Sequence, residues 1–315
     1  MSRAVLVLGG GGFIGSHVAE RFHREGDRVV VLDGLVPGTG GRAENLAALP
    51  PEIRQICARI EDAPDLDALL DEAEVIVDSM AWTAHHLALE SPRRDLDLNA
   101  ASHLALLERM PRAAHKTVIF LGSRGQYGNP KAPVITEETP MVPEDVQGIH
   151  KLAAESYFRV YAKRGGFGAT SLRFGNCFGP HQPREGRDIG LIGGFVRDLL
   201  AGKTVEVYGG GRTRFIVYAP DVAAVVHRLS RLVSPGFCAY NHAGHHVAIE
   251  TLVRMIQEIV GRGDVRIAPM PDEVRRLDIG EARFSEDRLA AALGEVPRTN
   301  LRAALEATAR DFTRG

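Results

Sequence analysis

The chain has little of what marks a secreted, membrane-bound or nucleic-acid-binding protein. Its 315 residues include only three cysteines, far apart and without the spacing of a metal site or a disulfide framework, which favours a reducing, cytoplasmic location. The longest weakly polar run, AVLVLGGGGFIG, is too short to cross a bilayer and is interrupted by glycines. The net charge is −2, with both signs interspersed and no basic block. We therefore expect no membrane or nucleic-acid partner, and any anionic ligand must be held by local groups.

Short apolar runs alternate with helical patterns through the first half of the chain. The segments RAVLVLGG, DRVVVLDG, AEVIVDSM, KTVIFLGS and GATSLRF have the composition of buried strands. Between them, segments such as IGSHVAERFHREG and NAASHLALLERM have apolar residues three and four positions apart. This alternation predicts an α/β fold with a doubly wound parallel sheet of Rossmann type.

The later part of the chain is less regular and mixes loops, short strands and helices. We expect a Rossmann domain over residues 1–175 and a smaller, mainly substrate-binding C-terminal lobe over residues 176–315. Segments near 215–243 are expected to return to the first domain, with AYNHAG as a strand of the main sheet.

A glycine-rich turn follows the first predicted strand and opens a helix. Gly9, Gly12 and Gly15 stand at three-residue spacing, with Phe13 and Ile14 between the last two. Glycines at this spacing allow a tight turn and a close approach of the backbone to a pyrophosphate at the helix N-terminus. Asp33 ends the next strand, where a carboxylate accepts hydrogen bonds from ribose hydroxyls and repels a 2′-phosphate. The pattern predicts a dinucleotide site that prefers NAD to NADP.

Further motifs follow in order along the chain: SPRRDLDLNAASHLALLE with Asn99, LGSRGQYG with Ser123, HKLAAES with Lys151, LRFGNCFGP with Asn176, and LLAGKTVEVYGGGRTRFIVYAPDV with Arg214. Together with GGGGFIG, the chain resembles the extended short-chain dehydrogenases/reductases, specifically the NAD-dependent nucleotide-sugar epimerase/dehydratase family. The resemblance runs over nearly the whole length. It implies transient hydride transfer to NAD from a carbon of a nucleotide-diphosphate sugar. It also implies a homodimer formed through the helices at 99–110 and 148–163.

The resemblance assigns residues to three parts of a site. Besides the glycine turn and Asp33, the cofactor side receives Ala81, Asn99 and Lys151. The segment after SMA is expected to face the sugar with Trp82, Thr83, His85 and His86. Asn176 and Arg214 are expected to hold the diphosphate, and Arg275, from PDEVRR, to reach the nucleotide. Ser123 is the hydroxyl that hydrogen-bonds the reacting oxygen.

One expected residue is missing. The family's tyrosine, the base that stands four residues before the lysine, is replaced by Gln147, whose amide does not exchange a proton at neutral pH. Family dehydratases carry an Asp-Glu pair directly after the serine or threonine, and the decarboxylases keep the glutamate. Here Arg124 and Gly125 occupy those positions, which counts against both reactions. Arg59 stands where the family usually has an aspartate near the adenine.

Several side chains are candidates for the missing acid/base group, and the sequence leaves them open. We place Ser123, Lys151, Gln147 and His150 in the catalytic region. His150 lies on the same predicted helix as Gln147, His85 and His86 follow the SMAWTA segment, and Lys151 becomes a base if burial lowers its pKa. Each histidine has a plain alternative as a surface residue, and Cys177 as a small buried hydrophobe rather than an acid/base thiol.

The leading hypothesis is therefore an NAD-dependent epimerase of a nucleotide-diphosphate sugar with acid/base chemistry that does not use tyrosine. Two rivals remain: a catalytically silent protein that binds NAD or a nucleotide sugar, and a reductase or isomerase whose substrate already carries a keto group. The segment NHAGHH supplies His242, His245 and His246 without a carboxylate or cysteine at metal-ligand spacing, so we expect no metal.

Overall fold

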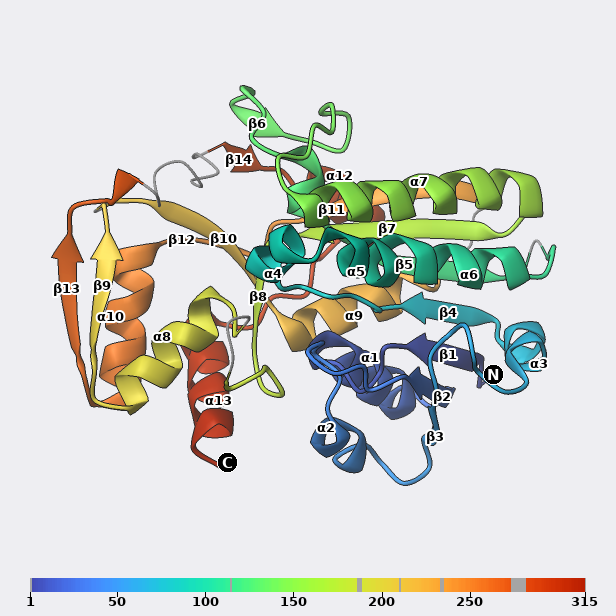
Figure 1. Ribbon diagram of the computed structural model, residues 1–315, viewed down its shortest axis with the longest axis horizontal. Helices are drawn as coiled ribbons and strands as arrows, with labels where there is room; N and C mark the ends of the chain where they lie inside the picture. The colour runs from blue at the N-terminus through green and yellow to red at the C-terminus, as the bar shows by residue number, and fades with distance from the viewer. Residues whose placement is uncertain are drawn as a thin grey trace.

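The computed structural model describes residues 2–113, 115–185, 189–209, 211–232, 235–272 and 282–314. Its centre is a sheet of seven strands in the order β11-β7-β5-β4-β1-β2-β3, each parallel to its neighbours (Figure 1). The strands are β1 (Ala4–Leu8), β2 (Arg28–Asp33), β3 (Arg54–Cys57), β4 (Val75–Asp78), β5 (Thr117–Ser123), β7 (Gly168–Phe174) and β11 (Gly236–His242). The predicted α/β class with a doubly wound parallel sheet is confirmed.

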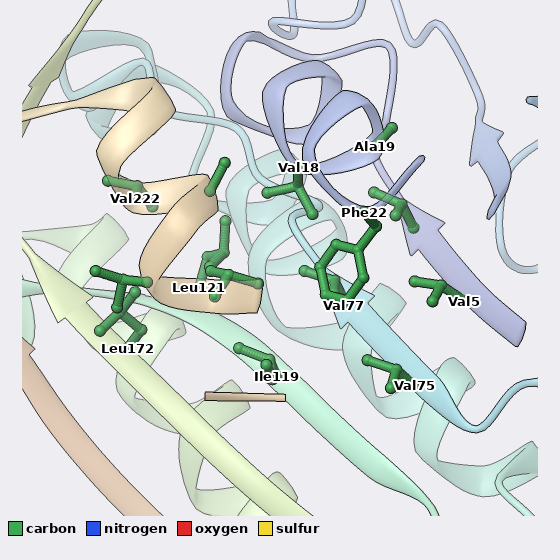
Figure 2. Close-up of a cluster of buried hydrophobic side chains, with 14 of the residues drawn as sticks. Val5, Val18, Ala19, Phe22, Val75, Val77, Ile119, Leu121, Leu172 and Val222 are labelled. Carbon is green, nitrogen blue, oxygen red and sulfur yellow. The ribbon is translucent and has the colours of Figure 1, made fainter. Parts of the chain in front are cut away.

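Helices cover both faces of this sheet, and strand residues alternate between them. Val5 and Val7 of β1 face the core under α1 (Phe13–Arg24) and α9 (Ala219–Leu229), which Figure 2 shows in close-up. Leu6 and Leu8 face the opposite core, under α3 (Leu66–Glu72), α6 (Ser102–Arg109) and α7 (Val146–Gly165). Because side chains of a strand point alternately to opposite faces, a continuous apolar run is what a strand buried on both faces requires.

In the described residues of the C-terminal lobe, small sheets pack against helices. β8 (Asn176–Phe178), β10 (Thr213–Tyr218) and β12 (His245–Ala248) form one sheet, and β9 (Thr204–Tyr208) pairs with β13 (Asp264–Ala268). Their apolar faces share a core with α8 (Leu191–Leu200), α10 (Ile249–Val260) and α13 (Leu301–Thr313). β11 lies at the edge of the main sheet beside β7, and α9 packs on α1. The domain boundary at residue 175 stays a prediction.

Shorter elements complete the chain: α2 (Ala43–Ala47), α4 (His85–Glu90), α5 (Pro92–Leu96), a π-helical segment (Asp97–Ala101), a 3₁₀ turn (Arg124–Tyr127), β6 (Val134–Ile135), β14 (Arg283–Phe284) and α12 (Asp287–Leu293). Among the described residues, no helix is both long enough and apolar enough to cross a membrane.

A buried polar cluster ties α7 to the sheet. Glu155 of α7 accepts hydrogen bonds from the Nε and Nη2 atoms of Arg173 on β7, at 2.8 and 2.5 Å. The same carboxylate accepts from Ser171 and from the amide of Gln126, and Arg173 also donates to the hydroxyl of Tyr127. Burial alone would raise the pKa of Glu155, but these donors hold it below its ordinary value. The cluster fixes the middle of α7 against β7, next to the strand ends that line the cavity.

Candidate functional site

One cavity of about 340 Å³ lies at the carboxyl ends of the main-sheet strands. Its lining begins at the glycine turn, with Gly9, Gly12, Phe13, Ile14 and Gly15, and reaches Asn176 and Leu191 in the other lobe. The chain runs outward from β1 through β2 to β3 and then crosses back to form β4 on the other side of β1, so the strand order reverses beside β1. Ligands of open α/β sheets bind at such a switch point.

The glycine turn leaves no room for side chains. Gly9 has φ +74°, in the left-handed region that favours glycine. A Cβ atom on Gly15 would stand 2.1 Å from the carbonyl oxygen of Gly9 and 2.6 Å from Oγ of Ser79. The turn therefore brings the N-terminus of α1 against β1. The first backbone N–H groups of a helix have no partner within the helix, so this end of the cavity suits an anion.

Asp33 closes this end of the cavity. Its Oδ2 accepts from the backbone N–H of Gly11 at 2.9 Å and its Oδ1 from that of Leu35 at 2.8 Å. Burial raises the pKa of the carboxyl group, and the backbone donors oppose that rise. Arg59 also lines the cavity, where its guanidinium pairs with Glu61 at 3.0 Å. A glycine cradle, a helix N-terminus and a carboxylate for ribose hydroxyls fit a dinucleotide such as NAD.

Lys151 lies deeper, below the end of β5. Its ammonium donates to the carbonyl oxygens of Met80 at 3.3 Å and Leu121 at 3.2 Å, and it stands 4.7 Å from the ring centre of Phe120. Burial lowers the pKa of Lys151 to about 8, although the nearby carboxylates of Asp78 and Asp95 act in the opposite direction. The lysine is therefore mainly charged at neutral pH but loses its proton at a lower pH than an ordinary lysine does.

Gln147 lines the cavity beside Lys151, but its amide is directed to the backbone. Nε2 donates to the carbonyl oxygen of Trp82 at 2.6 Å. Asn99, fully buried, holds the same residue from the other side: Oδ1 accepts from the N–H of Trp82 at 2.9 Å and Nδ2 donates to its carbonyl at 2.8 Å. Asn99 thus acts on the cavity through the Trp82 backbone. Gln147 and Asn99 together fix the course of the loop that leads to His85.

Ser123 ends β5 at the cavity wall. Its Oγ accepts from the backbone N–H of Gly125 at 3.0 Å, and its own N–H donates to the side chain of Gln126 at 2.7 Å. These two bonds form a capping box at the start of the 3₁₀ turn. Because the oxygen is already an acceptor in this turn, the hydroxyl proton remains available for donation to a ligand.

Two histidines near the cavity have carboxylate partners. His85, the first residue of α4, lines the cavity, and its Nδ1 stands 3.4 Å from Oδ2 of Asp145. His150 directs its Nδ1 to Oδ1 of buried Asp95 at 2.6 Å, and within the described chain it is not among the residues that line the cavity. The exposed His86 is not among them either.

The substrate side of the cavity combines both lobes. Asn176 lines it from β8, which runs parallel to β10, the strand that carries Arg214. The buried Trp82 donates its indole N–H to the carbonyl of Gly38 at 2.8 Å, while the exposed Thr83 lines the cavity. Arg124 is buried after Ser123, and its pKa is lowered by burial and by the nearby charge of Arg214.

The family model for the NAD dependent epimerase/dehydratase family matches residues 5–241. The chain belongs to this family. NAD is its cofactor, and the prediction of an NAD-dependent enzyme of the epimerase kind is confirmed. This chain is 30% identical to the UDP-glucose 4-epimerase of Mycolicibacterium smegmatis over 313 residues, 98% of this chain and 97% of the relative.

Solved structures agree over the full length. The UDP-glucose 4-epimerase of Thermus thermophilus, in complex with NAD, is 28% identical and has a TM-score of 0.82, covering 98% of this chain and 99% of the other. The UDP-glucose 4-epimerase of Thermotoga maritima, with UDP-glucose, is 26% identical with a TM-score of 0.83, covering 99% of each chain. The resemblance noted in the sequence is therefore confirmed, while the individual site residues stay predictions.

Most residues that the resemblance assigns to the site line the cavity, while the others do not line it or lie outside the described residues. The glycine turn, Asp33, Ala81, Ser123, Gln147, Lys151 and Asn176 line one cavity. Asn99 and Trp82 support its wall, and Arg275 lies outside the described residues. Sequence reasoning missed Asp145 and Asp95, the partners of the two histidines. An aspartate just before a predicted helix is an N-cap signal, so Asp145 could have been noticed, but its contact with His85 could not.

Cys177 and the histidines of the NHAGHH segment were the other candidates for acid/base or metal chemistry. Cys177 lines the cavity and packs against the core, and burial raises the pKa of its thiol, which disfavours a thiolate. Burial lowers the pKa of His242 to about 4, with Arg298 acting in the same direction. Within the described part of the chain, no three histidine, cysteine or acidic side chains gather as a metal site would require.

Proposed function

We propose that this family member epimerises a nucleotide-diphosphate sugar, with a UDP-sugar as substrate, carbon 4 as the reacting centre and an acid/base group other than tyrosine. The observation that carries the proposal is the continuity of one cavity from the glycine turn, past Ser123 and Lys151, to Asn176. The relatives support the choice of substrate, since the Mycolicibacterium and Thermotoga proteins are UDP-glucose 4-epimerases.

The chain's own residues would divide the work along this cavity. NAD supplies the hydride acceptor when it is bound. The glycine turn and Asp33 would hold its pyrophosphate and adenosine ribose, and Lys151 the second ribose. Ser123 would donate a hydrogen bond to the reacting oxygen, and Asn176 with Arg214 would hold the diphosphate.

The direct test is turnover. The purified protein is incubated with NAD and a panel of UDP-, dTDP-, GDP- and CDP-sugars in D₂O, and products are separated by ion-pairing chromatography with mass detection. An isobaric product from a UDP-sugar supports the proposal. Tight binding of NAD and a nucleotide sugar without a product would instead select the silent binding protein. Turnover only of a keto-sugar with NADH would select the reductase.

Arg214→Ala tests the substrate side separately. Removing a charge-assisted contact to the diphosphate is expected to weaken nucleotide-sugar binding about 10- to 150-fold, from roughly 1.5–3 kcal/mol per such bond. Calorimetric titration measures this. Arg254→Ala is the matched control, because Arg254 is an exposed arginine of α10 paired with Glu250. Unchanged affinity in Arg214→Ala would contradict the assignment.

We also propose that the chain forms a homodimer through α6 and α7. These helices pack side by side (Figure 1), and exposed apolar residues lie on α7 and on the neighbouring α5: Leu96, Ile149, Tyr157 and Val160. Light scattering at micromolar concentration is expected to give twice the mass of the chain. Ile149→Lys combined with Val160→Lys is expected to give a monomer, and a monomeric unmodified protein would overturn the proposal.

A further inference from the structure

We propose that the imidazole of His85, held by the carboxylate of Asp145, takes and returns the substrate proton in place of the missing tyrosine. The inference rests on the proposed function, since it assigns the acid/base group of that reaction. It is carried by a juxtaposition: His85 lies in the cavity wall, and the carboxylate of Asp145 stands beside its Nδ1.

His85 lies in the wall of the cavity that is proposed to hold the substrate. It is the histidine that lines the cavity within the described chain, and it does so together with Ser123, Gln147 and Lys151. The loop that leads to it is fixed at Trp82, whose backbone N–H and carbonyl are both bonded to Asn99. A general base must first lie within reach of the proton that it removes. Here the buried side chain of Asn99 holds the backbone that precedes His85.

Asp145 supplies the second half of the arrangement. Its Oδ1 accepts from the backbone N–H of Gly148 at 2.6 Å, as N-cap of α7, which fixes the carboxylate. Its Oδ2 is then turned toward Nδ1 of His85 at 3.4 Å. Although burial alone would raise the pKa of Asp145, the hydrogen bond with His85 and the Gly148 amide bring it below its ordinary value. An ionised carboxylate at Nδ1 places the ring proton there, so Nε2 is the basic nitrogen.

The alternatives are engaged in the frame of the site. The amide of Gln147 donates to the carbonyl of Trp82, and the ammonium of Lys151 donates to two carbonyls. His150 is bonded to Asp95, which is fully buried and also accepts from Asn99 at 2.9 Å. That pair stabilises the packing of α5 against α7. The amide of Gln147 exchanges no proton at neutral pH, and His150 is not among the residues that line the cavity within the described chain. Lys151, with a pKa lowered to about 8, is mainly protonated at neutral pH and so is a poor proton acceptor there.

The O–H bond of the substrate hydroxyl breaks and its proton passes to Nε2 of His85, while the carbon gives its hydrogen and an electron pair to NAD and becomes a carbonyl. Ser123 donates a hydrogen bond to the carbonyl oxygen. The hydride then returns to the opposite face of the carbon, and the imidazolium gives its proton back to the oxygen. The sugar is neither oxidised nor reduced overall.

The test compares His85→Gln with His115→Gln, which changes an exposed histidine near the amino end of β5. His85→Gln is expected to lower kcat about 100- to 10,000-fold, the usual contribution of one acid/base side chain, with KM and NAD affinity within about threefold. His115→Gln is expected to match the unmodified protein. If the unmodified protein turns over substrate and His85→Gln retains more than a tenth of its kcat, the inference fails and the proposed function stands. If the unmodified protein binds nucleotide sugar without turnover, the proposed function itself fails.

Asp145→Asn tests the positioning residue, because asparagine keeps the N-cap acceptor and removes the charge. We expect kcat to fall about tenfold or more with KM unchanged and with the thermal unfolding midpoint retained. Two-bond ¹H–¹⁵N spectra of the unmodified protein give a readout that needs no turnover. The neutral ring of His85 is expected to carry its proton on Nδ1, and to lose that preference in Asp145→Asn. A ring protonated on Nε2 in the unmodified protein would overturn the inference.

Discussion

The two ends of the cavity are built in different ways. At the dinucleotide end, the glycine turn and Asp33 come from one β-α-β stretch, and most of the fit is backbone. At the reacting end, the lining comes from β5, α7, β8 and the loop before α4, elements far apart in the chain. The first end has the glycine turn and the carboxylate that the dinucleotide motif requires. The second has Ser123 and Lys151 but Gln147 in place of the tyrosine, and we propose that another side chain moves the proton there. A site made of side chains on separate elements can exchange one of them without disturbing the backbone.

Gln147, at the position of the family's tyrosine, makes a hydrogen bond that supports the cavity wall. The amide lies where the family has its base, and it hydrogen-bonds the Trp82 carbonyl that Asn99 also bonds. At this position the side chain therefore supports the loop at Trp82 through a hydrogen bond. Four substitutions test the two ends of the cavity, and the first removes a buried charge beneath the reacting end.

Glu155→Gln is expected to have the largest effect on stability. It leaves the buried guanidinium of Arg173 without its counter-charge, which typically costs about 3–5 kcal/mol of the free energy of unfolding. Because the folded-state pKa of Glu155 is lowered, its contribution is present above the unfolded-state pKa and is lost as pH falls through the folded value. Denaturant titration from pH 7 to pH 3 measures both.

The control is Glu72→Gln, which removes an exposed partner of Arg28 and is expected to cost less than about 1 kcal/mol. If the two variants lost the same free energy of unfolding, the buried cluster around Glu155 would not stabilise the fold beneath the reacting end.

Gly15→Ala attacks the dinucleotide end. The added Cβ has to displace the Gly9 carbonyl, because it would lie 2.1 Å away, so α1 must move from β1. We expect NAD affinity to fall at least about 100-fold, or roughly 2.7 kcal/mol. Gly194→Ala in α8 is the control, since its nearest contact would be an ordinary 3.7 Å. Fluorescence titration with NAD decides the case, and unchanged affinity in Gly15→Ala would refute the close-packed turn.

Lys151 lies between the two ends and is expected to titrate anomalously. Its pKa of about 8, lowered by burial, means that it is charged below pH 8 and neutral above it. The unfolded chain, with an ordinary lysine pKa near 10.4, then binds more protons between about pH 8 and 10.4. Stability from this group therefore rises with pH in that window. A ¹³C titration of lysine Cε signals should show one midpoint near pH 8 that disappears in Lys151→Met, and its absence would contradict the burial argument.

Gln147→Ala is expected to have the smallest effect. Trp82 keeps its hydrogen bond from Asn99, so the loss is about 1 kcal/mol of stability. Because the amide moves no proton, kcat should stay within about tenfold. A fall as large as the one expected for His85→Gln would show that Gln147 takes a direct part in the reaction.

Much of the fold and one end of the site could be predicted from local pattern. The apolar runs gave the strands of the parallel sheet, and the spacing of Gly9, Gly12 and Gly15 before Asp33 indicated the dinucleotide turn. The missing tyrosine was also visible in sequence. What could not be predicted was the pairing of His85 with Asp145 and of His150 with Asp95, because each pair joins different elements.

The sequence by itself determined the class of fold, the cofactor and the absence of the usual base, since each depends on residues close together in the chain. The tertiary structure alone decided which histidine faces the cavity and that the amide of Gln147 faces Trp82. The physical reason is that side-chain direction at the reacting end is set by packing of α4, α5 and α7, and by the buried bonds of Asn99 and Asp95. Those contacts join residues that are far apart in the chain, so a local sequence pattern cannot predict them.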